Sequence, residues 1–220
     1  VTDQPMDQVY KNNYGTFTVM DRNLGAVRND RGATDSDWID AMGVLYQWGR
    51  KDPFTVTFEN SNLISQLYSV NSSKVSIAST VANPTVYIGG NNTTWVESDN
   101  TMMWSRSQKT IYDPCPHGYR VISREAWRGF TKDGQNHYDE LDYYNISGDY
   151  DKGWLFKYDG DKTTYYPANN NIDRNGNYQW NRHYNGDMWS STASSSTYAY
   201  RFRFYYDDGN SNIEVDGADR

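Results

Sequence analysis

Clusters of positive charge and long apolar runs are both missing from this sequence. Its 21 Lys and Arg residues are scattered among 28 Asp and Glu residues, and the formal net charge is −7. A nucleic-acid-binding surface needs clustered cations to release counterions from phosphates, and a membrane-surface helix needs a basic amphipathic stretch. No apolar segment approaches the roughly 20 residues that span a bilayer. We therefore expect neither a nucleic-acid partner nor direct insertion into a membrane.

Residue patterns typical of catalytic sites are scarce as well. The three histidines, His117, His137 and His183, are far apart in the chain, and none belongs to an HExxH-like pair. The single cysteine, Cys115, lies between two prolines, which indicates a rigid corner and not a nucleophile paired with His117. Neither a Gly-x-Ser-x-Gly elbow nor a phosphate-binding Gly-rich loop is present. We expect a non-enzymatic protein; a carbohydrate-active enzyme with a carboxylate pair is the alternative that the many aspartates leave open.

A regular metal-binding pattern is missing too, and we expect no cofactor. Segment 173–177 has the composition of a calcium loop, but its glycine is fourth in order and Tyr184 stands where an EF-hand has its bidentate glutamate. An irregular Ca²⁺ site made of turn aspartates is an open alternative to ordinary solvated turns. Its candidate ligands are Asp149, Asp151, Asp159, Asp161, Asp207 and Asp208.

Aromatic residues are abundant, with 8 Trp, 20 Tyr and 7 Phe in 220 residues. Disordered chains are poor in aromatics, whereas each buried ring removes roughly 150–250 Å² from water. We therefore predict one folded domain over residues 1–220, with a core made of large rings. Trp38, Trp48, Trp127 and Trp189 are expected to be largely buried.

Two helices are predicted among many short strands. The first covers about 35–49, because apolar residues recur at three- and four-residue spacing from Trp38 to Trp48 and an Asp or Ser at 35–37 is suited to cap it. The second begins after Ser123, with Ala126, Trp127 and Phe130 facing inward.

Strand signals surround these helices. Residues 9–26 indicate a strand, a turn and a strand, and the Ser/Thr/Asn-rich segment 55–100 is predicted as loops and short strands. After residue 132, turn residues separate short aromatic strands at 153–158, 188–192 and 198–206. The pattern predicts an α+β domain with two helices, several short antiparallel strands and long loops.

The C-terminal part, about residues 169–220, has the Tyr/Asn/Ser/Asp composition of an antibody paratope. Alternation along 198–205 sends Phe202 and Phe204 to one face and Arg201, Arg203 and Tyr205 to the other. Two arginines flanked by tyrosines would suit an acidic or glycan-bearing partner. Polar loops and an edge strand without a binding role are the alternative. The predicted ligand-binding residues are Tyr178, Trp180, Arg182, Tyr184, Arg201, Arg203, Tyr205, Asp208, Asn210 and Asn212.

Four ordered motifs carry a family resemblance. They are Val19–Ala26, Gly43–Phe54, Asp113–Val121 and Trp189–Thr192. Together they resemble the Fibrobacter succinogenes major paralogous domain family, and the resemblance covers about residues 9–205. This family is abundant in surface proteins of gut Bacteroidetes. The resemblance implies a C-type-lectin-like fold and an extracellular or cell-surface location, and the chain is expected to be a processed or excised part of a longer protein.

The same scaffold carries the variable proteins of diversity-generating retroelements, including pilus-tip adhesins. In those variable proteins, adenine-directed mutagenesis of Asn codons near the C-terminus yields Asn, Tyr, Ser, Asp, Thr, His, Ile or Gly, and the stretch from Tyr178 to Asn212 looks like such an output. The resemblance implies an adhesin or receptor-binding module whose ligand is a protein or glycan on another cell. The alternative is a structural pilin or envelope subunit that uses the same face for assembly.

Two departures from the pattern concern the chain end and sugar binding. Family members commonly end in a Gly-x-x-Val-Arg-Cys-Val-like strand that this sequence lacks. Either a cysteine beyond Arg220 pairs with Cys115, as the resemblance implies, or Cys115 is free. The Glu-Pro-Asn and Trp-Asn-Asp calcium–sugar motifs of animal C-type lectins are also missing, so fold is implied more strongly than sugar binding.

Overall fold

The computed structural model describes residues 7–12, 15–59, 62–90, 94–97, 103–135, 137, 141–159, 162–179, 184–207 and 210–219. Within these ranges the chain forms three short α-helices, two 3₁₀ helices and fourteen strands, most of them paired in antiparallel fashion. The expected α+β class is therefore confirmed. None of the described helices has the length and apolar character needed to cross a membrane.

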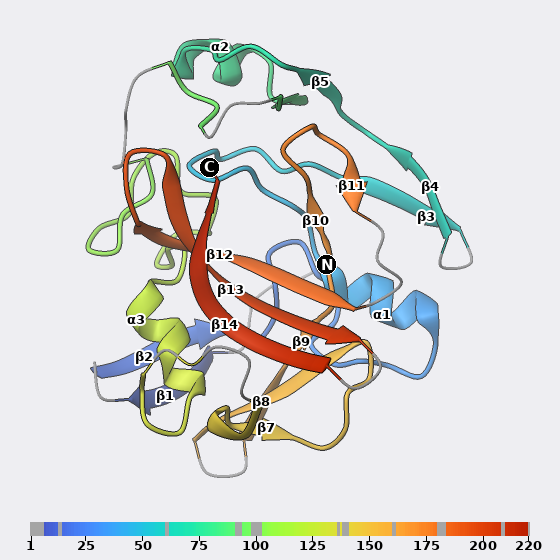
Figure 1. Cartoon of the computed structure of the whole chain (residues 1–220), viewed down its shortest axis with the longest axis vertical. Helices are drawn as coiled ribbons and strands as arrows, with labels where there is room; N and C mark the ends of the chain where they lie inside the picture. The colour runs from blue at the N-terminus through green and yellow to red at the C-terminus, as the bar shows by residue number, and fades with distance from the viewer. Residues whose placement is uncertain are drawn as a thin grey trace.

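A three-stranded antiparallel sheet lies at the centre of the molecule (Figure 1). It consists of β12 (Asn185–Ala193), β13 (Tyr198–Asp207) and β14 (Asn210–Asp219). The register places Met188 opposite Phe202, and Phe204 opposite Ile213. These four residues are buried and form one wall of the first core.

Aromatic rings from neighbouring elements complete this first core. Helix α3 (Arg124–Trp127) contributes Trp127, which stacks on Phe202 with ring centroids 4.8 Å apart, and η1 (Arg128–Phe130) follows it directly. A second sheet of β7 (Ile146–Ser147), β8 (Gly153–Asp159) and β9 (Lys162–Pro167) adds further buried rings. Close by lie η2 (Leu141–Tyr143) and the hairpin of β1 (Asp7–Asn12) and β2 (Gly15–Met20). Ser123 caps α3 as expected, by accepting a hydrogen bond from the Ala126 amide.

A second core lies on the other side of the central sheet. It contains Trp48, Trp95 and Trp104, and Ala199 of β13 packs against them. The Trp48 indole donates to the Ser190 carbonyl at 2.8 Å, and the Trp189 indole donates to the Tyr46 carbonyl at 3.0 Å. Burial is thus confirmed for Trp38, Trp48 and Trp127, whereas Trp189 is only partly buried.

The segment between β5 and β6 contains an unexpected helix. Strand β5 (Ser69–Asn71) pairs in parallel with β6 (Val86–Ile88), and α2 (Ile77–Ala82) connects them at the top of Figure 1. Ser76 caps α2 by accepting from the Ser79 amide. The helix was not predicted because its six residues are too few to show a helical period.

The first helix is shorter than predicted. Helix α1 (Asp35–Met42) begins after Thr34, whose hydroxyl accepts from the Asp37 amide, and not after an Asp or Ser. It ends at Gly43, which has a φ of 75°. A side chain at that position would lie 2.4 Å from the Leu24 carbonyl, so glycine is required there. The apolar residues up to Trp48 continue in an irregular segment in which Leu45 bridges to Phe54.

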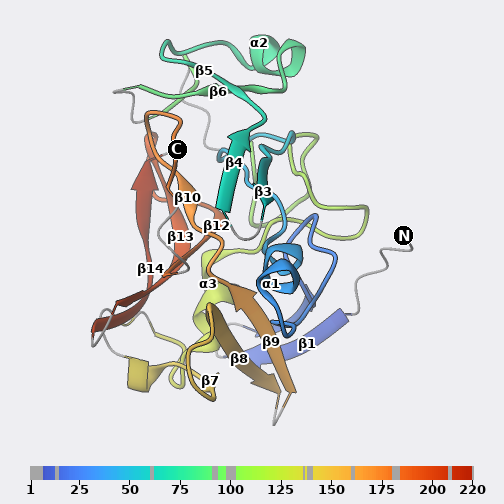
Figure 2. The ribbon, with the colours of Figure 1, turned by 90° about the vertical axis from the view of Figure 1, so that its right-hand side faces the viewer.

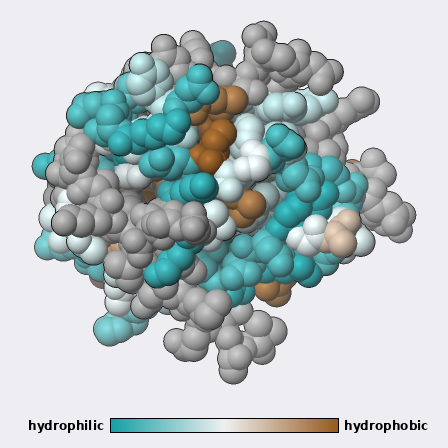
Figure 3. All heavy atoms as spheres, turned by 90° about the horizontal axis from the view of Figure 1, so that it is seen from below, coloured by the Kyte–Doolittle hydropathy of each residue, from teal (hydrophilic) through white to brown (hydrophobic). Residues whose placement is uncertain are grey.

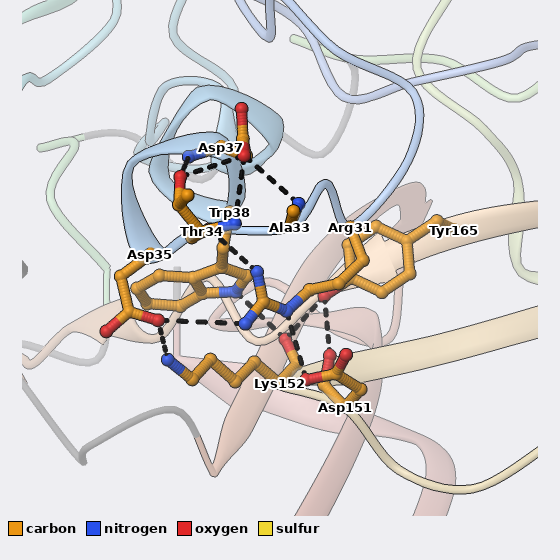
Figure 4. Close-up of polar contacts among 9 residues, drawn as sticks. All are labelled: Arg31, Ala33, Thr34, Asp35, Asp37, Trp38, Asp151, Lys152 and Tyr165. Carbon is orange, nitrogen blue, oxygen red and sulfur yellow. Dashed lines mark hydrogen bonds and ion pairs between the residues drawn. The ribbon is translucent and has the colours of Figure 1, made fainter.

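Helix α1 is tied to the start of β8 by charged and aromatic groups (Figure 4). The carbonyl of Lys152 accepts from the Trp38 indole and from the Tyr165 hydroxyl, each at 2.9 Å. The Lys152 ammonium group bonds to Asp35, and Arg31 pairs with Asp151 at 3.0 Å. Lys152 has a φ of 52°, a conformation unusual for a residue with a side chain, and these contacts hold it there.

Two short strand pairs lie near α1, and the first of them stands above that helix in the rotated view (Figure 2). They are β3 (Val56–Glu59) with β4 (Asn62–Gln66), and β10 (Asn171–Ile172) with β11 (Tyr178–Gln179). With Trp38 and Met42 they enclose a third apolar cluster.

Candidate functional site

The two faces of β13 differ as the alternation predicts. Phe202 and Phe204 are fully buried, while Arg201, Arg203 and Tyr205 are partly exposed on the opposite face. We call the set Asp187, Trp189, Arg201, Arg203 and Tyr205 the outer face. Strand register places Asp187 and Trp189 of β12 opposite Arg203 and Arg201, so the five residues share one side of the sheet.

The outer face opens gradually along the strand. At its closed end Ala199 is buried in the second core, and beside it Trp189 is half-covered by the segment around Tyr46. Arg201 keeps 18% of its side chain exposed and Arg203 keeps 31%. The exposed fraction of the side chains therefore increases from Ala199 toward Arg203.

Asp187 is the functional candidate that sequence reasoning missed. Its carboxylate lies 3.0 Å from the Arg201 Nη1 atom and 3.9 Å from the Arg203 Nε atom, and only 8% of its side chain is exposed. The sequence held a signal, since Asp187 and Trp189 alternate with buried Met188 in the same way as Arg201 and Arg203 alternate with Phe202. That pattern did not reveal which residues of β13 would lie opposite.

A groove of about 1130 Å³ runs beside this face. Its walls come from four stretches of chain, 16–20, 44–47, 118–123 and 169–174, and from Asp187, Trp189 and Arg201 of the outer face. Pockets of this size hold ligands in many proteins. Asp187, Trp189 and Arg201 thus belong both to the outer face and to the wall of this groove.

The asparagines at the groove wall are structural. Asn169 accepts from the Asp187 amide at 3.0 Å and donates to the Asp187 carbonyl at 3.4 Å through its side chain. Asn170 is fully buried with a φ of 55°, and its amide donates to the Asn185 carbonyl. These bonds attach residues 169–171 to β12 and fix the groove wall next to Asp187.

The structure brings together only part of the predicted site. Tyr178 was expected on the exposed patch, but only 6% of it is exposed, and its hydroxyl donates to the Asn169 carbonyl at 3.1 Å. That placement is wrong because β11 turns the ring toward α1. Tyr184 is partly buried beside β13, where its carbonyl accepts from the Tyr206 amide.

For the remaining predicted residues, the structure gives either no description or the backbone position alone. Trp180, Arg182 and Asp208 lie outside the described residues. Asn210 and Asn212 belong to β14, where the backbone register sets them opposite Asp207 and Tyr205. Asn212 is therefore the predicted residue that shares a register position with the outer face.

Cys115 lies in the groove wall as a free thiol. Burial, together with the neighbouring Asp113 carboxylate, raises the pKa of this thiol to about 12. Asp113 accepts from the backbone amides of Cys115 and Val121 and from the Lys109 ammonium group, all within 3.0 Å. The corner expected from the flanking prolines is thus held by a buried carboxylate, and the thiol is a poor nucleophile there.

Carboxylates and apolar residues elsewhere on the described surface are dispersed. Among the described residues, no group of three or more His, Cys, Asp or Glu side chains is close enough to hold a metal ion. Of the six aspartates considered for calcium, Asp161 and Asp208 lie outside the described residues, and the side chains of Asp159 and Asp207 are not described either. Seen from below, the described surface is mostly hydrophilic, and hydrophobic residues form small areas near its middle (Figure 3). Small scattered areas of this kind are normal for a protein surface.

Comparisons with known proteins give no relative. No protein-family model matches the chain, and neither the curated proteins nor the solved structures contain a match. The family resemblance therefore depends on the four ordered sequence motifs alone.

Proposed function

We propose that this chain is a non-enzymatic binding module that recognises its partner through the outer face. The observation that carries this proposal is the division of β13 into a fully buried side, Phe202 and Phe204, and a partly exposed side, Arg201, Arg203 and Tyr205. Tyr, Trp and Arg dominate the binding energy of protein interfaces. A partner bound here would contact such residues without disturbing the aromatic core behind them.

The setting we propose is a bacterial cell surface or pilus tip, where the chain acts as an adhesin or receptor-binding domain of C-type-lectin-like fold. The four motifs and the acidic, aromatic-rich composition support this setting. The Asn/Tyr/Ser-rich stretch from Tyr178 to Asn212 supports diversification by a retroelement. A reverse-transcriptase gene beside a near-copy of the coding region for this stretch is the observation that tests it.

Cell binding tests the role of the outer face. The fluorescently labelled chain is titrated onto a panel of intact bacterial and epithelial cells, and its apparent Kd is compared with that of Tyr205→Ala. We expect Tyr205→Ala to weaken binding about thirtyfold, which corresponds to about 2 kcal/mol. Tyr143→Ala is the matched control, because Tyr143 is 42% exposed in η2, outside the outer face.

Two further readouts separate the alternatives. Protease treatment of the target cells removes protein ligands, whereas mild periodate oxidation destroys glycans. Binding that survives Tyr205→Ala but not Tyr143→Ala contradicts the proposal. Concentration-dependent self-association that Tyr205→Ala abolishes would instead indicate an assembly subunit.

A further inference from the structure

Strand β2 has one edge that no described strand covers. It pairs with β1, and within the described chain these two strands form a sheet of their own. In an antiparallel pair, every second residue directs its N–H and C=O groups away from the partner strand. Thr16, Thr18 and Met20 form no backbone hydrogen bond with any described residue outside β1. β2 therefore keeps an edge that is available to a further strand.

This edge faces the groove of about 1130 Å³. Every residue from 16 to 20 lines the groove. Neighbouring side chains of a strand point to opposite sides, so consecutive residues border one cavity only where the edge of the strand faces that cavity. The partner strand β1 lies against β8 and η1 instead. The groove is therefore the space next to the unpaired edge of β2.

A second run of consecutive residues, 118–123, also lines the groove. Residues 118–122 belong to no helix or strand. Two hydrogen bonds attach this run to the rest of the fold: the Val121 amide donates to the Asp113 carboxylate at 2.9 Å, and the Ile122 carbonyl accepts from the Ser191 amide at 2.8 Å. The groove thus has fixed main chain in at least two of its walls.

The side chains of the wall indicate which occupant is suited to the groove. Val19, Val44 and Val121 are half-buried aliphatic groups of the wall. Arg120 and Arg174 also line the groove; both are exposed, and neither forms an ion pair with a described residue. In a chain whose net charge is −7, these two cations favour carboxylates in the occupant.

The size of the groove favours a peptide segment over a small molecule. Small-molecule sites usually measure about 300–1,000 Å³, and this groove is larger. A strand rises about 3.3 Å per residue, so the run 16–20 offers a pairing length of roughly 17 Å. Because four stretches of chain enclose the groove, a single segment enters it more readily than the edge of a folded second copy.

From this geometry we propose that the groove is a strand-acceptor site for a partner protein. The occupant is one extended segment of another chain, with aliphatic side chains at alternate positions and carboxylates at its ends, and it pairs through its backbone with β2. Backbone pairing at a sheet edge supplies affinity, and contacts to alternate side chains supply specificity. This site goes beyond the proposed function, because it is a second contact surface that does not include Tyr205.

The probe is the peptide Glu-Val-Thr-Val-Thr-Val-Glu, labelled for fluorescence anisotropy, and we expect it to bind the wild-type chain saturably. Two matched peptides carry one N-methyl group each, on the central valine or on a neighbouring threonine, so that together they block either edge of the peptide. We expect at least one of them to bind about tenfold more weakly, the effect of one backbone hydrogen bond left unmade. Absence of saturable binding, or equal binding of all three peptides, overturns the proposal.

Amide hydrogen exchange shows where the peptide lies. We expect exchange to slow at residues 16–20 when the peptide binds and to stay unchanged in η2, which does not line the groove. Slowing that leaves residues 16–20 unaffected overturns the proposal. Light scattering tests the other occupant: a dimer that the peptide dissociates would make a second copy the occupant and overturn the choice of a partner chain.

Charge reversal at the wall tests the chemistry of the occupant. Arg120→Glu/Arg174→Glu is expected to weaken peptide binding about tenfold, because two surface attractions become repulsions. Lys51→Glu/Lys74→Glu is the matched control, with the same change in net charge at exposed residues outside the groove. Equal losses in the two variants overturn the proposal. Tyr205→Ala should leave peptide binding unchanged; a loss as large as that of the wall variant would make the groove part of the outer face and overturn a separate site.

Discussion

The two faces of β13 have opposite roles although their residues alternate one by one. The inner face inserts Phe202 and Phe204 among the rings of Trp127, Phe130 and Phe156, and both are fully buried. The outer face passes from buried Ala199 through the Asp187–Arg201 pair to partly exposed Tyr205. The comparison teaches that the inner side of β13 is fully buried at Phe202 and Phe204, whereas the other side changes along the strand from buried Ala199 to partly exposed, ion-paired residues.

The inner face gives the largest expected effect. Phe202→Ala removes a ring that stacks on Trp127 at 4.8 Å and leaves a cavity in a fully buried site. We expect a loss of about 3–5 kcal/mol in the free energy of unfolding, measured by urea denaturation. A loss below about 1 kcal/mol would mean that the first core does not carry the fold.

A smaller loss of stability is expected when a side chain is added at Gly186, on the inner face of the sheet. Gly186 lies opposite Phe204, and a β-carbon there would lie 2.2 Å from the Phe204 Cζ atom. Gly186→Ala should therefore cost about 1–3 kcal/mol through overpacking. Adding Phe204→Leu should recover part of that loss; a double variant less stable than the sum of the two single changes would contradict this contact.

The dependence of stability on alkaline pH tests the burial of Tyr166 in the first core. Burial raises the pKa of Tyr166, which packs in the first core, above the ordinary value of 10.0. A group with a raised folded pKa contributes stability that is complete below the unfolded pKa and is lost as pH rises beyond it. Stability should therefore be constant with respect to this tyrosine up to about pH 9 and fall above pH 10. Urea denaturation across this range, with absorbance at 295 nm to follow ionisation, checks the sign; stability that rises above pH 10 would contradict it.

The outer face should hardly affect stability. Tyr205→Ala truncates a partly exposed ring that lies outside the three apolar clusters. We expect its free energy of unfolding to stay within about 0.5 kcal/mol of the wild type. The same urea measurement checks it, and a loss comparable to that of Phe202→Ala would make both faces of β13 structural.

The smallest expected effect is that of metal removal. No ligand set with suitable spacing occurs in the sequence, so EDTA should leave the thermal unfolding midpoint unchanged. Unfolding by EDTA, reversed by Ca²⁺ and not by Mg²⁺, would show that turn aspartates hold a structural ion. Stability would then reside partly outside the aromatic cores.

Local patterns were sufficient for much of the scaffold. The Ser123 cap, the inward rings of Trp127 and Phe130, and the alternation of β13 were all predicted, because caps and alternation depend on neighbours in the chain. The disulfide that the family resemblance implies for Cys115 stays a prediction, because Cys115 is the single cysteine of the sequence.

Other features depend on residues far apart in sequence. The end of α1 at Gly43 follows from its close approach to Leu24, and the turn of Tyr178 into the protein follows from its bond to Asn169 and its packing near α1. Neither is visible in a local pattern, because helical spacing continues past Gly43 and Tyr178 has the neighbours of a surface loop.

By itself, the sequence determined the α+β class, the aromatic core and the two faces of β13, because composition and alternation act within a few residues. Only the tertiary structure decided that Asp187 lies beside Arg201 and Arg203. Strand pairing sets that register, and pairing depends on where distant segments meet. A charge that looks free in the sequence is therefore balanced in the fold.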